Sequence, residues 1–170
     1  MRYLVLILVA GGGLCSGQTA PGGKSGDDFV YRWNGYGFFA SGGTVMEGGQ
    51  PGFRGGGGGF EGFLWKGITA GADVSALYEK YLNAGHTSGH LGANLGYPFA
   101  SRTKQRGMAP FVLFGVGEFF PNEPQAVVHG GAGFNYWIRR HVAVRIEFRV
   151  GARELRDDVV GTFRAGVSFR

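Results

Sequence analysis

The chain has 170 residues, of which 44% are hydrophobic, 15% aromatic and only 17% charged, so it forms one domain and not a disordered linker. Its 35 glycines exclude an all-helical fold, because Gly costs about 1 kcal/mol relative to Ala in a helix interior, and they predict a mainly β fold. The formal net charge is +5, but the basic residues are dispersed among apolar ones, which argues against nucleic-acid binding.

The N-terminal segment predicts a secretory signal peptide. Arg2 precedes an apolar run over 4–10, and small residues follow it. The run is shorter than the roughly 20 residues of a membrane-crossing helix. We therefore expect a signal peptide over 1–17, with cleavage between residues 17 and 20. Lipidation of Cys15 is the less favoured interpretation, because Leu14 occupies a position that is small in lipoprotein signals, and cleavage would remove the only cysteine.

A polar leader over 18–29 precedes the domain, which we place at 30–170. From there the sequence alternates between apolar and other residues, the pattern of β-strands with one apolar face. The alternation predicts eight strands, at 32–43, 54–65, 67–79, 88–100, 108–120, 126–138, 141–154 and 159–170.

The connections between these strands differ in length. Those over 44–53 and 80–87 are long, whereas 66–67 and 139–140 are tight. Such asymmetry is typical of membrane barrels, although 101–107 is longer than the pattern requires. Aromatic residues at the strand ends predict two interfacial belts, or equally core aromatics of a soluble barrel. One belt contains Trp33, Trp65, Tyr97, Phe111, Trp137 and Phe169, and the other Tyr78, Tyr81, Phe119 and Phe120.

The signal peptide, the eight strands and the final alternation Phe163-x-Ala165-x-Val167-x-Phe169 together resemble the small outer-membrane β-barrel proteins of Gram-negative bacteria, the opacity-protein-like group. The resemblance covers about residues 30–170. It implies an all-β fold, an eight-stranded antiparallel up-and-down transmembrane β-barrel in the outer membrane. It also implies that these four residues form an assembly signal, recognised by the barrel-assembly machinery. Arg170 extends the family pattern by one residue.

A barrel in lipid must close, because every backbone polar group needs an internal partner. Eight strands leave an interior just wide enough for side chains, so we expect no open general pore. The expected lipid-facing residues are Val142, Val144, Ile146, Phe148 and Val150. The expected lumen charge network contains Glu61, Asp73, Glu118, Glu147, Arg145, Arg149 and Arg164. A solvated face of a soluble barrel is the alternative, but 13 of the 17 basic residues are Arg, which suits buried pairs.

No motif predicts a catalytic, cofactor or metal site. The Gly57-x-Gly59-x-x-Gly62 match to a dinucleotide fingerprint opens no helix. His86 and His90 have no acidic or Cys ligand nearby in sequence. His129 resembles the catalytic His of outer-membrane lipid A deacylases, but Gly131 stands where their nucleophilic Ser would be.

Three functions follow from the sequence. We favour a non-enzymatic outer-membrane barrel, in contact with outer-membrane lipid, with a structural or surface-interaction role. The alternatives are a lipid-modifying outer-membrane enzyme and a soluble secreted lipocalin-like barrel, although the first strand lacks the Gly-x-Trp of lipocalins. No motif identifies a partner for the external loops.

Overall fold

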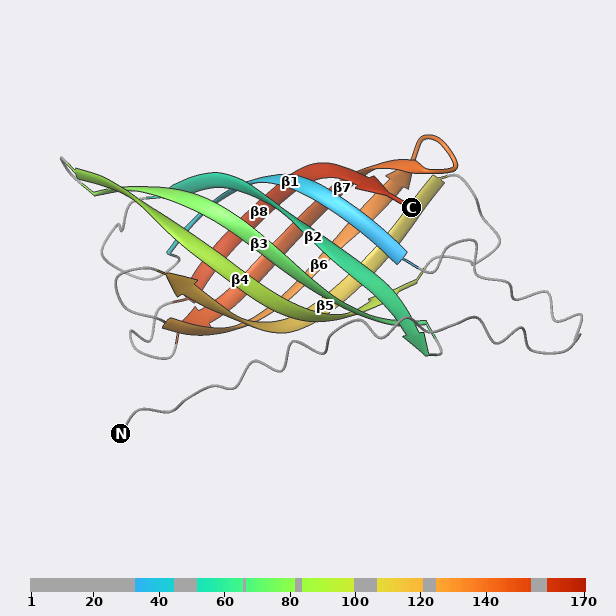
Figure 1. The fold of residues 1–170 in the computed structure, drawn as a ribbon, viewed down its shortest axis with the longest axis horizontal. Coiled ribbons are helices and arrows are strands. Elements are labelled where there is room, and N and C mark those ends of the chain that lie inside the picture. Colours follow the sequence, from blue (N-terminus) through green and yellow to red (C-terminus); the bar gives the residue numbers. More distant parts are fainter. Residues whose placement is uncertain are drawn as a thin grey trace, which may run out of the picture.

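Eight antiparallel strands close into one barrel in the computed structural model, which describes residues 33–44, 52–65, 67–81, 84–99, 107–120, 125–153 and 159–170 (Figure 1). The strands are β1 (Trp33–Thr44), β2 (Phe53–Trp65), β3 (Ile68–Tyr81), β4 (Ala84–Pro98), β5 (Gly107–Phe120), β6 (Gln125–Trp137), β7 (Val142–Arg153) and β8 (Val159–Phe169). Each strand pairs with its sequence neighbour, and β1 pairs with β8 to close the barrel. The all-β, eight-stranded antiparallel prediction is confirmed. The predicted signal peptide and leader lie outside the described residues.

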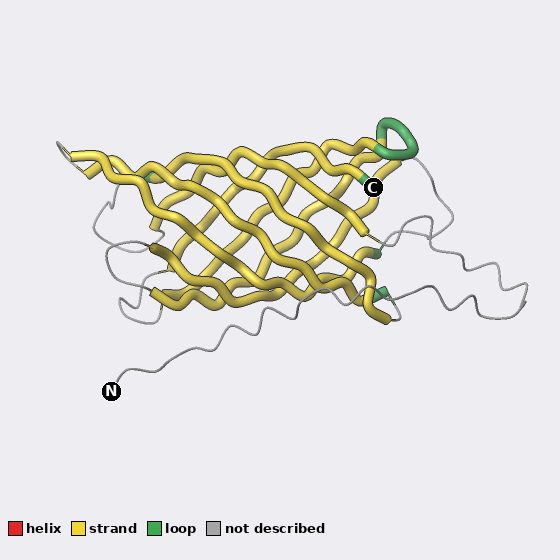
Figure 2. The backbone as a smooth tube through the Cα atoms, in the orientation of Figure 1, coloured by secondary structure: helices red, strands yellow, loops and turns green. Residues whose placement is uncertain are grey.

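The strands run obliquely around the barrel (Figure 2). We call the end where β1 finishes the loop end, and the end where β1 starts and β8 finishes the turn end. Among the described residues, no helix has the length and apolar character needed to cross a membrane.

The main difference from the predicted elements lies in the β3–β4 hairpin. The sequence predicts a long loop over 80–87, but Tyr81 pairs with Ala84, and both strands continue past the rest of the loop end (Figure 1). The segment Ala84–Thr87 carries no apolar alternation, so its sequence looks like a loop. Pairing with β3 makes it a strand nonetheless.

The two faces of the barrel have opposite polarity. The outward face carries large exposed apolar side chains on every strand, among them Phe39, Phe60, Val74, Leu95, Phe114, Val128, Phe148 and Phe163. The inward face carries the buried polar and charged residues, among them Asn34, Asp73, His90, His129, Arg145, Glu147, Arg149 and Arg164. Soluble proteins bury their apolar side chains, whereas this barrel buries much of its polar content.

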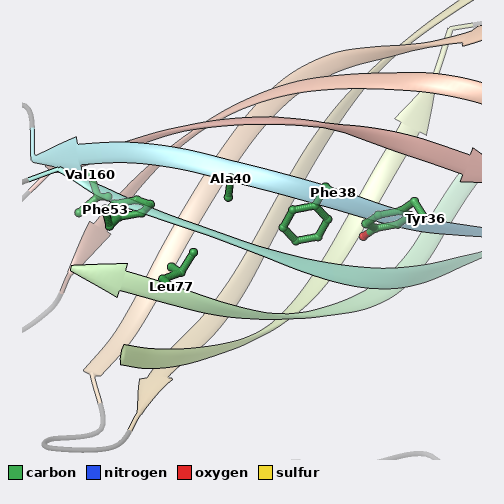
Figure 3. Close-up of a cluster of buried hydrophobic side chains, with 6 residues drawn as sticks. All are labelled: Tyr36, Phe38, Ala40, Phe53, Leu77 and Val160. Carbon is green, nitrogen blue, oxygen red and sulfur yellow. The ribbon is translucent and has the colours of Figure 1, made fainter. Parts of the chain in front are cut away.

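Apolar clusters occupy parts of the lumen beside these charges. One contains Tyr36, Phe38, Ala40, Phe53, Leu77 and Val160 and extends along β1 toward the loop end (Figure 3). The other, at the turn end, contains Ala109, Trp137 and Ala143.

The predicted aromatic belts need correction. Trp33, Tyr97 and Phe169 are exposed on the outward face, as are Tyr78 and Phe120 at the loop end. Phe111 and Trp137 instead point inward and are buried, and Phe119 packs against the lumen cluster around Leu77. The sequence places these three at strand ends, but their parity assigns them to the lumen. The side chains of Trp65 and Tyr81 lie outside the described set.

Glycine on the inward face makes room for large lumen side chains. A Cβ atom at Gly59 would lie 2.5 Å from the ring of Tyr36, and one at Gly117 would lie 2.6 Å from Nε2 of His90. Both distances are far below van der Waals contact. The narrow lumen therefore accounts for glycine at these positions of β2 and β5.

Candidate functional site: the charged lumen

Glu147 is the centre of an ion-pair network inside the barrel. Its carboxylate, only 1% exposed, accepts hydrogen bonds from Arg145 Nε at 3.0 Å and Arg145 Nη2 at 2.8 Å, both on Oε2. Arg149 donates through Nε to Oε1, and Arg164 Nη1 lies 3.7 Å from the same oxygen. Residues 145, 147 and 149 occupy successive inward positions of β7, so the alternation of one strand supplies three of the four groups.

Asp73 extends the network across the lumen to β3. Its Oδ1 accepts a hydrogen bond from Arg164 Nη1 at 3.2 Å, and its Oδ2 lies 2.9 Å from Arg149 Nη2. Asn94 on β4 donates to Oδ2 at 2.7 Å. His90 Nδ1 is 3.7 Å from Oδ1, too long for a hydrogen bond.

Glu61 completes the network toward the turn end. Arg145 Nη1 lies 3.3 Å from Glu61 Oε1, which also accepts from Asn34 Nδ2 at 2.7 Å. Three guanidinium groups thus face three carboxylates, and the formal charges balance. This balance matters because an unpaired buried charge costs about 3–5 kcal/mol.

Aromatic rings hold two of the guanidinium groups in place. The Cζ atom of Arg145 lies 4.2 Å from the ring centroids of both Tyr36 and Phe111. Arg164 lies 4.4 Å above the ring of Phe38. These cation–π contacts orient planar cations whose edges remain available to the carboxylates.

The structure brings six of the seven predicted lumen charges together. The prediction for the seventh, Glu118, is wrong. Glu118 has the outward parity of β5, and its neighbours across the ladder are Leu91 and Ala126. The inward positions there are Gly117 and Phe119. The strand ends with Phe119 on the inward face and Phe120 on the outward face, so aromatic residues on both faces hide the alternation in the sequence. The sequence therefore assigns Glu118 to the wrong face.

Sequence reasoning missed the polar residues that accompany the charges. His129 Nε2 lies 2.7 Å from Asn94 Oδ1, and Arg149 Nη1 is 3.2 Å from the same ring nitrogen. His90 and Asn94 alternate with apolar residues in the sequence, so strand parity was the available signal. Among the described residues, no group of three or more His, Cys, Asp or Glu side chains could hold a metal ion. The side chain of His86 lies outside the described set.

The network separates two cavities. The cavity toward the turn end is lined by Tyr36, Glu61, Thr69, Asn94, Phe111, Asn135 and Arg145, among others. The cavity toward the loop end is lined by His90, His129, Thr162, Arg164 and several apolar residues. Arg149 borders both. The ion-pair network, which we call the ionic layer, therefore lies between these two partly open cavities. We call them the turn-end vestibule and the loop-end vestibule.

The two outward sets predicted from sequence lie on the outer face. Val144, Phe148 and Val150 are exposed, and Val142 and Ile146 are partly exposed on the same face of β7. In β8, the outward positions are Phe163, Ala165, Val167 and Phe169. β8 pairs with both β7 and β1, so this set lies at the seam where the barrel closes.

A closed eight-stranded barrel with an apolar outside and a charged lumen defines the fold of the small outer-membrane β-barrels. The chain is similar to Neisserial surface protein A, at 12% identity and a TM-score of 0.63, covering 81% of this chain and 96% of that one. It is also similar to the N-terminal β-barrel domain of OprF from Pseudomonas aeruginosa, at 12% identity and a TM-score of 0.58, covering 81% and 98%.

A third similar structure is the attachment invasion locus protein Ail of Yersinia pestis, at 12% identity and a TM-score of 0.55, covering 81% of this chain and 97% of that one. No protein-family model and no curated protein matches the sequence. At these identities the structural likeness establishes the fold.

Proposed function

We propose that the protein is an integral outer-membrane β-barrel with a structural or surface-interaction role and a lumen closed by the Glu147 network. The observation that carries this proposal is the inverted polarity of the barrel. Large apolar side chains such as Phe39, Phe114 and Phe148 are more than half exposed, whereas Arg145 and Glu147 are buried. In water this arrangement is unfavourable, and in a lipid bilayer it is the favourable one.

The strand dimensions support insertion in a bilayer. The strands contain between 11 and 15 residues. A tilted transmembrane strand needs about 9–11 residues, so every strand is long enough to cross. The closed β1–β8 pairing removes the sheet edges that lipid could not satisfy.

The ionic layer supports a closed lumen and not a general diffusion pore. Arg145 reaches Glu61 on β2, and Arg149 and Arg164 reach Asp73 on β3; the three arginine side chains are at most 8% exposed. An ion or solute would have to break several charge-assisted contacts to pass between the vestibules.

The rival functions fit less well. A lipid-modifying enzyme needs an activated nucleophile, but His129 is hydrogen-bonded to Asn94 inside the lumen, and Gly131 has no hydroxyl group. A soluble lipocalin-like barrel should face its apolar side chains inward, opposite to the arrangement of β7. We therefore propose no catalytic role, no cofactor and no nucleic-acid partner.

Cell fractionation tests this proposal. The chain should partition with outer membranes and change its gel mobility on boiling, because a closed barrel resists detergent until it is heated. Reconstituted protein should give no large, steady conductance in planar bilayers. Recovery from the soluble periplasmic fraction would favour the lipocalin-like alternative, and stable porin-like channels would refute the closed lumen.

A further inference from the structure

The vestibule at the loop end differs chemically from the one at the turn end. It has a volume of about 430 Å³, counting the space that opens to solvent. Its polar lining consists of Arg149, Arg164, His90, His129 and Thr162. None of the described residues that line it is Asp or Glu, whereas the turn-end vestibule includes Glu61.

The carboxylates of the network lie behind these basic groups. Asp73 and Glu147 bind Arg149 and Arg164 but do not line the loop-end vestibule. These two acids pair with the guanidinium groups on the side away from the loop-end vestibule. The polar part of the vestibule wall therefore presents hydrogen-bond donors and no carboxylate of the network, an arrangement that suits an anionic group.

Three of the lining residues carry buried polar atoms without hydrogen-bond partners in the described part of the chain: His90 Nδ1, Arg164 Nε and Arg149 Nη2. Arg149 Nη2 still has an ionic contact with Asp73, whereas within the described residues no such close contact is seen for the other two atoms. The side chain of His90 is 4% exposed and that of Arg164 is 8% exposed. Buried polar atoms in native proteins are nearly always hydrogen-bonded, so unpaired ones beside a cavity call for an explanation. A ligand acceptor in the vestibule supplies one.

The remaining wall of the vestibule is apolar. Ala40, Leu77 and Val160 belong to the buried cluster shown in Figure 3, and Phe119 and Val127 add to the lining. An apolar wall with a few convergent polar groups is the usual composition of a small-molecule site.

We infer that the loop-end vestibule binds a small organic acid that carries a compact apolar body, such as an aromatic monocarboxylate. The carboxylate accepts hydrogen bonds from the donors at the floor, around Arg164 and His90. The apolar body packs against Leu77, Val127 and Val160. The ligand enters from the loop end, and the ionic layer stops it from passing through.

Fluorine NMR titrations of the full chain in nanodiscs test this inference, with empty nanodiscs as the blank. The probe is 4-fluorobenzoate, compared with 4-fluorobenzamide, which lacks the charge, and with fluoroacetate, which lacks the apolar ring. We expect saturable binding of 4-fluorobenzoate and binding of the amide that is weaker by about tenfold or more, because charge-assisted hydrogen bonds are lost. Fluoroacetate should bind more weakly than the benzoate. Equal affinities for the acid and the amide, or no saturable binding of the acid, would overturn the inference.

A pair of variants locates the site. Val160→Phe fills the apolar wall of the loop-end vestibule and should abolish saturable 4-fluorobenzoate binding. Leu113→Phe enlarges a side chain of the turn-end vestibule and should leave the affinity unchanged. The reverse pattern would place the ligand in the wrong half of the lumen and refute the assignment. If Val160→Phe fails to assemble, the comparison of acid with amide on the unmodified chain still decides whether the site recognises an acid.

Discussion

Arg164 on β8 and Asp73 on β3 are 91 residues apart in sequence, yet Nη1 of the arginine lies 3.2 Å from Oδ1 of the aspartate inside the barrel. Their strands are not neighbours in the sheet, since β1 and β2 stand between them. The contact therefore crosses the lumen and acts together with the Glu147 contacts as an internal brace.

Removing the central acid should weaken the barrel strongly. Glu147→Ala leaves Arg145 and Arg149 without their shared acceptor, and we expect a loss of about 3–5 kcal/mol, the usual cost of leaving a buried charge unpaired. Urea unfolding in lipid vesicles measures it. Glu118→Ala is the matched control, because its carboxylate has the outward parity near the loop end, and its effect should be small. Equal effects of the two variants would contradict a structural role for the network.

A charge at the middle of the outer face of β7 should also destabilise the protein. Ile146→Arg places a guanidinium among outward apolar side chains, at an expected cost of about 2–4 kcal/mol if this position faces the bilayer midplane. Ala152→Arg, exposed nearer the loop end of the same strand, should cost less. Vesicle unfolding titrations compare the two, and an identical cost at both depths would argue against a membrane-embedded face.

The inward glycines should not tolerate a methyl group. Gly59→Ala places a Cβ atom 2.5 Å from the Tyr36 ring, so the ring must move, and we expect a loss of about 1–3 kcal/mol from overpacking. Gly37→Ala is the control, because its nearest neighbour would lie 3.9 Å away on the outer face. The midpoint temperature of the heat-induced gel-mobility shift measures the stability of both variants. A lower midpoint temperature for Gly37→Ala than for Gly59→Ala would be inconsistent with the proposed packing.

The last strand should contribute to assembly separately from stability. Phe169→Ala removes the final aromatic side chain of β8 and is expected to reduce the folded fraction in outer membranes, because the final alternation of this chain resembles the assembly signal of small outer-membrane barrels. Tyr136→Ala, equally exposed at the turn end of β6, serves as the control. Refolding from urea into detergent should be similar for both variants. If the two variants assembled equally well in cells, β8 would have no special role in recognition.

The fold could be predicted because the alternation of apolar and polar residues within each strand shows which residues lie on which face. The alternation from Val142 to Val150 identifies β7 directly, and the same parity places Arg145, Glu147 and Arg149 in the lumen. The predicted face or strand boundary was wrong where apolar and polar residues no longer alternate. Glu118 lies beside two aromatic residues, and the start of β4 has no apolar residue on alternate positions.

The partners within the lumen could not be predicted from the sequence. Strand parity shows that Asp73 and Arg164 point inward, but their contact depends on the tilt and register of strands that are not adjacent. The glycines are a usable signal of packing. The glycine run over 55–59 predicts close approach of aromatic side chains from neighbouring strands, and Gly59 and Gly117 mark the places where Tyr36 and His90 need room.

The distribution of the network along the chain has a consequence for the order of folding. The first half of the barrel contributes Glu61 and Asp73, whereas the second half contributes three arginines and a single acid, Glu147. Within the network, each half-barrel therefore contributes an excess of one sign, and the two excesses are equal and opposite. Neutralisation occurs only when the halves meet, so the charges that brace the finished barrel also favour closure over a partly formed open sheet.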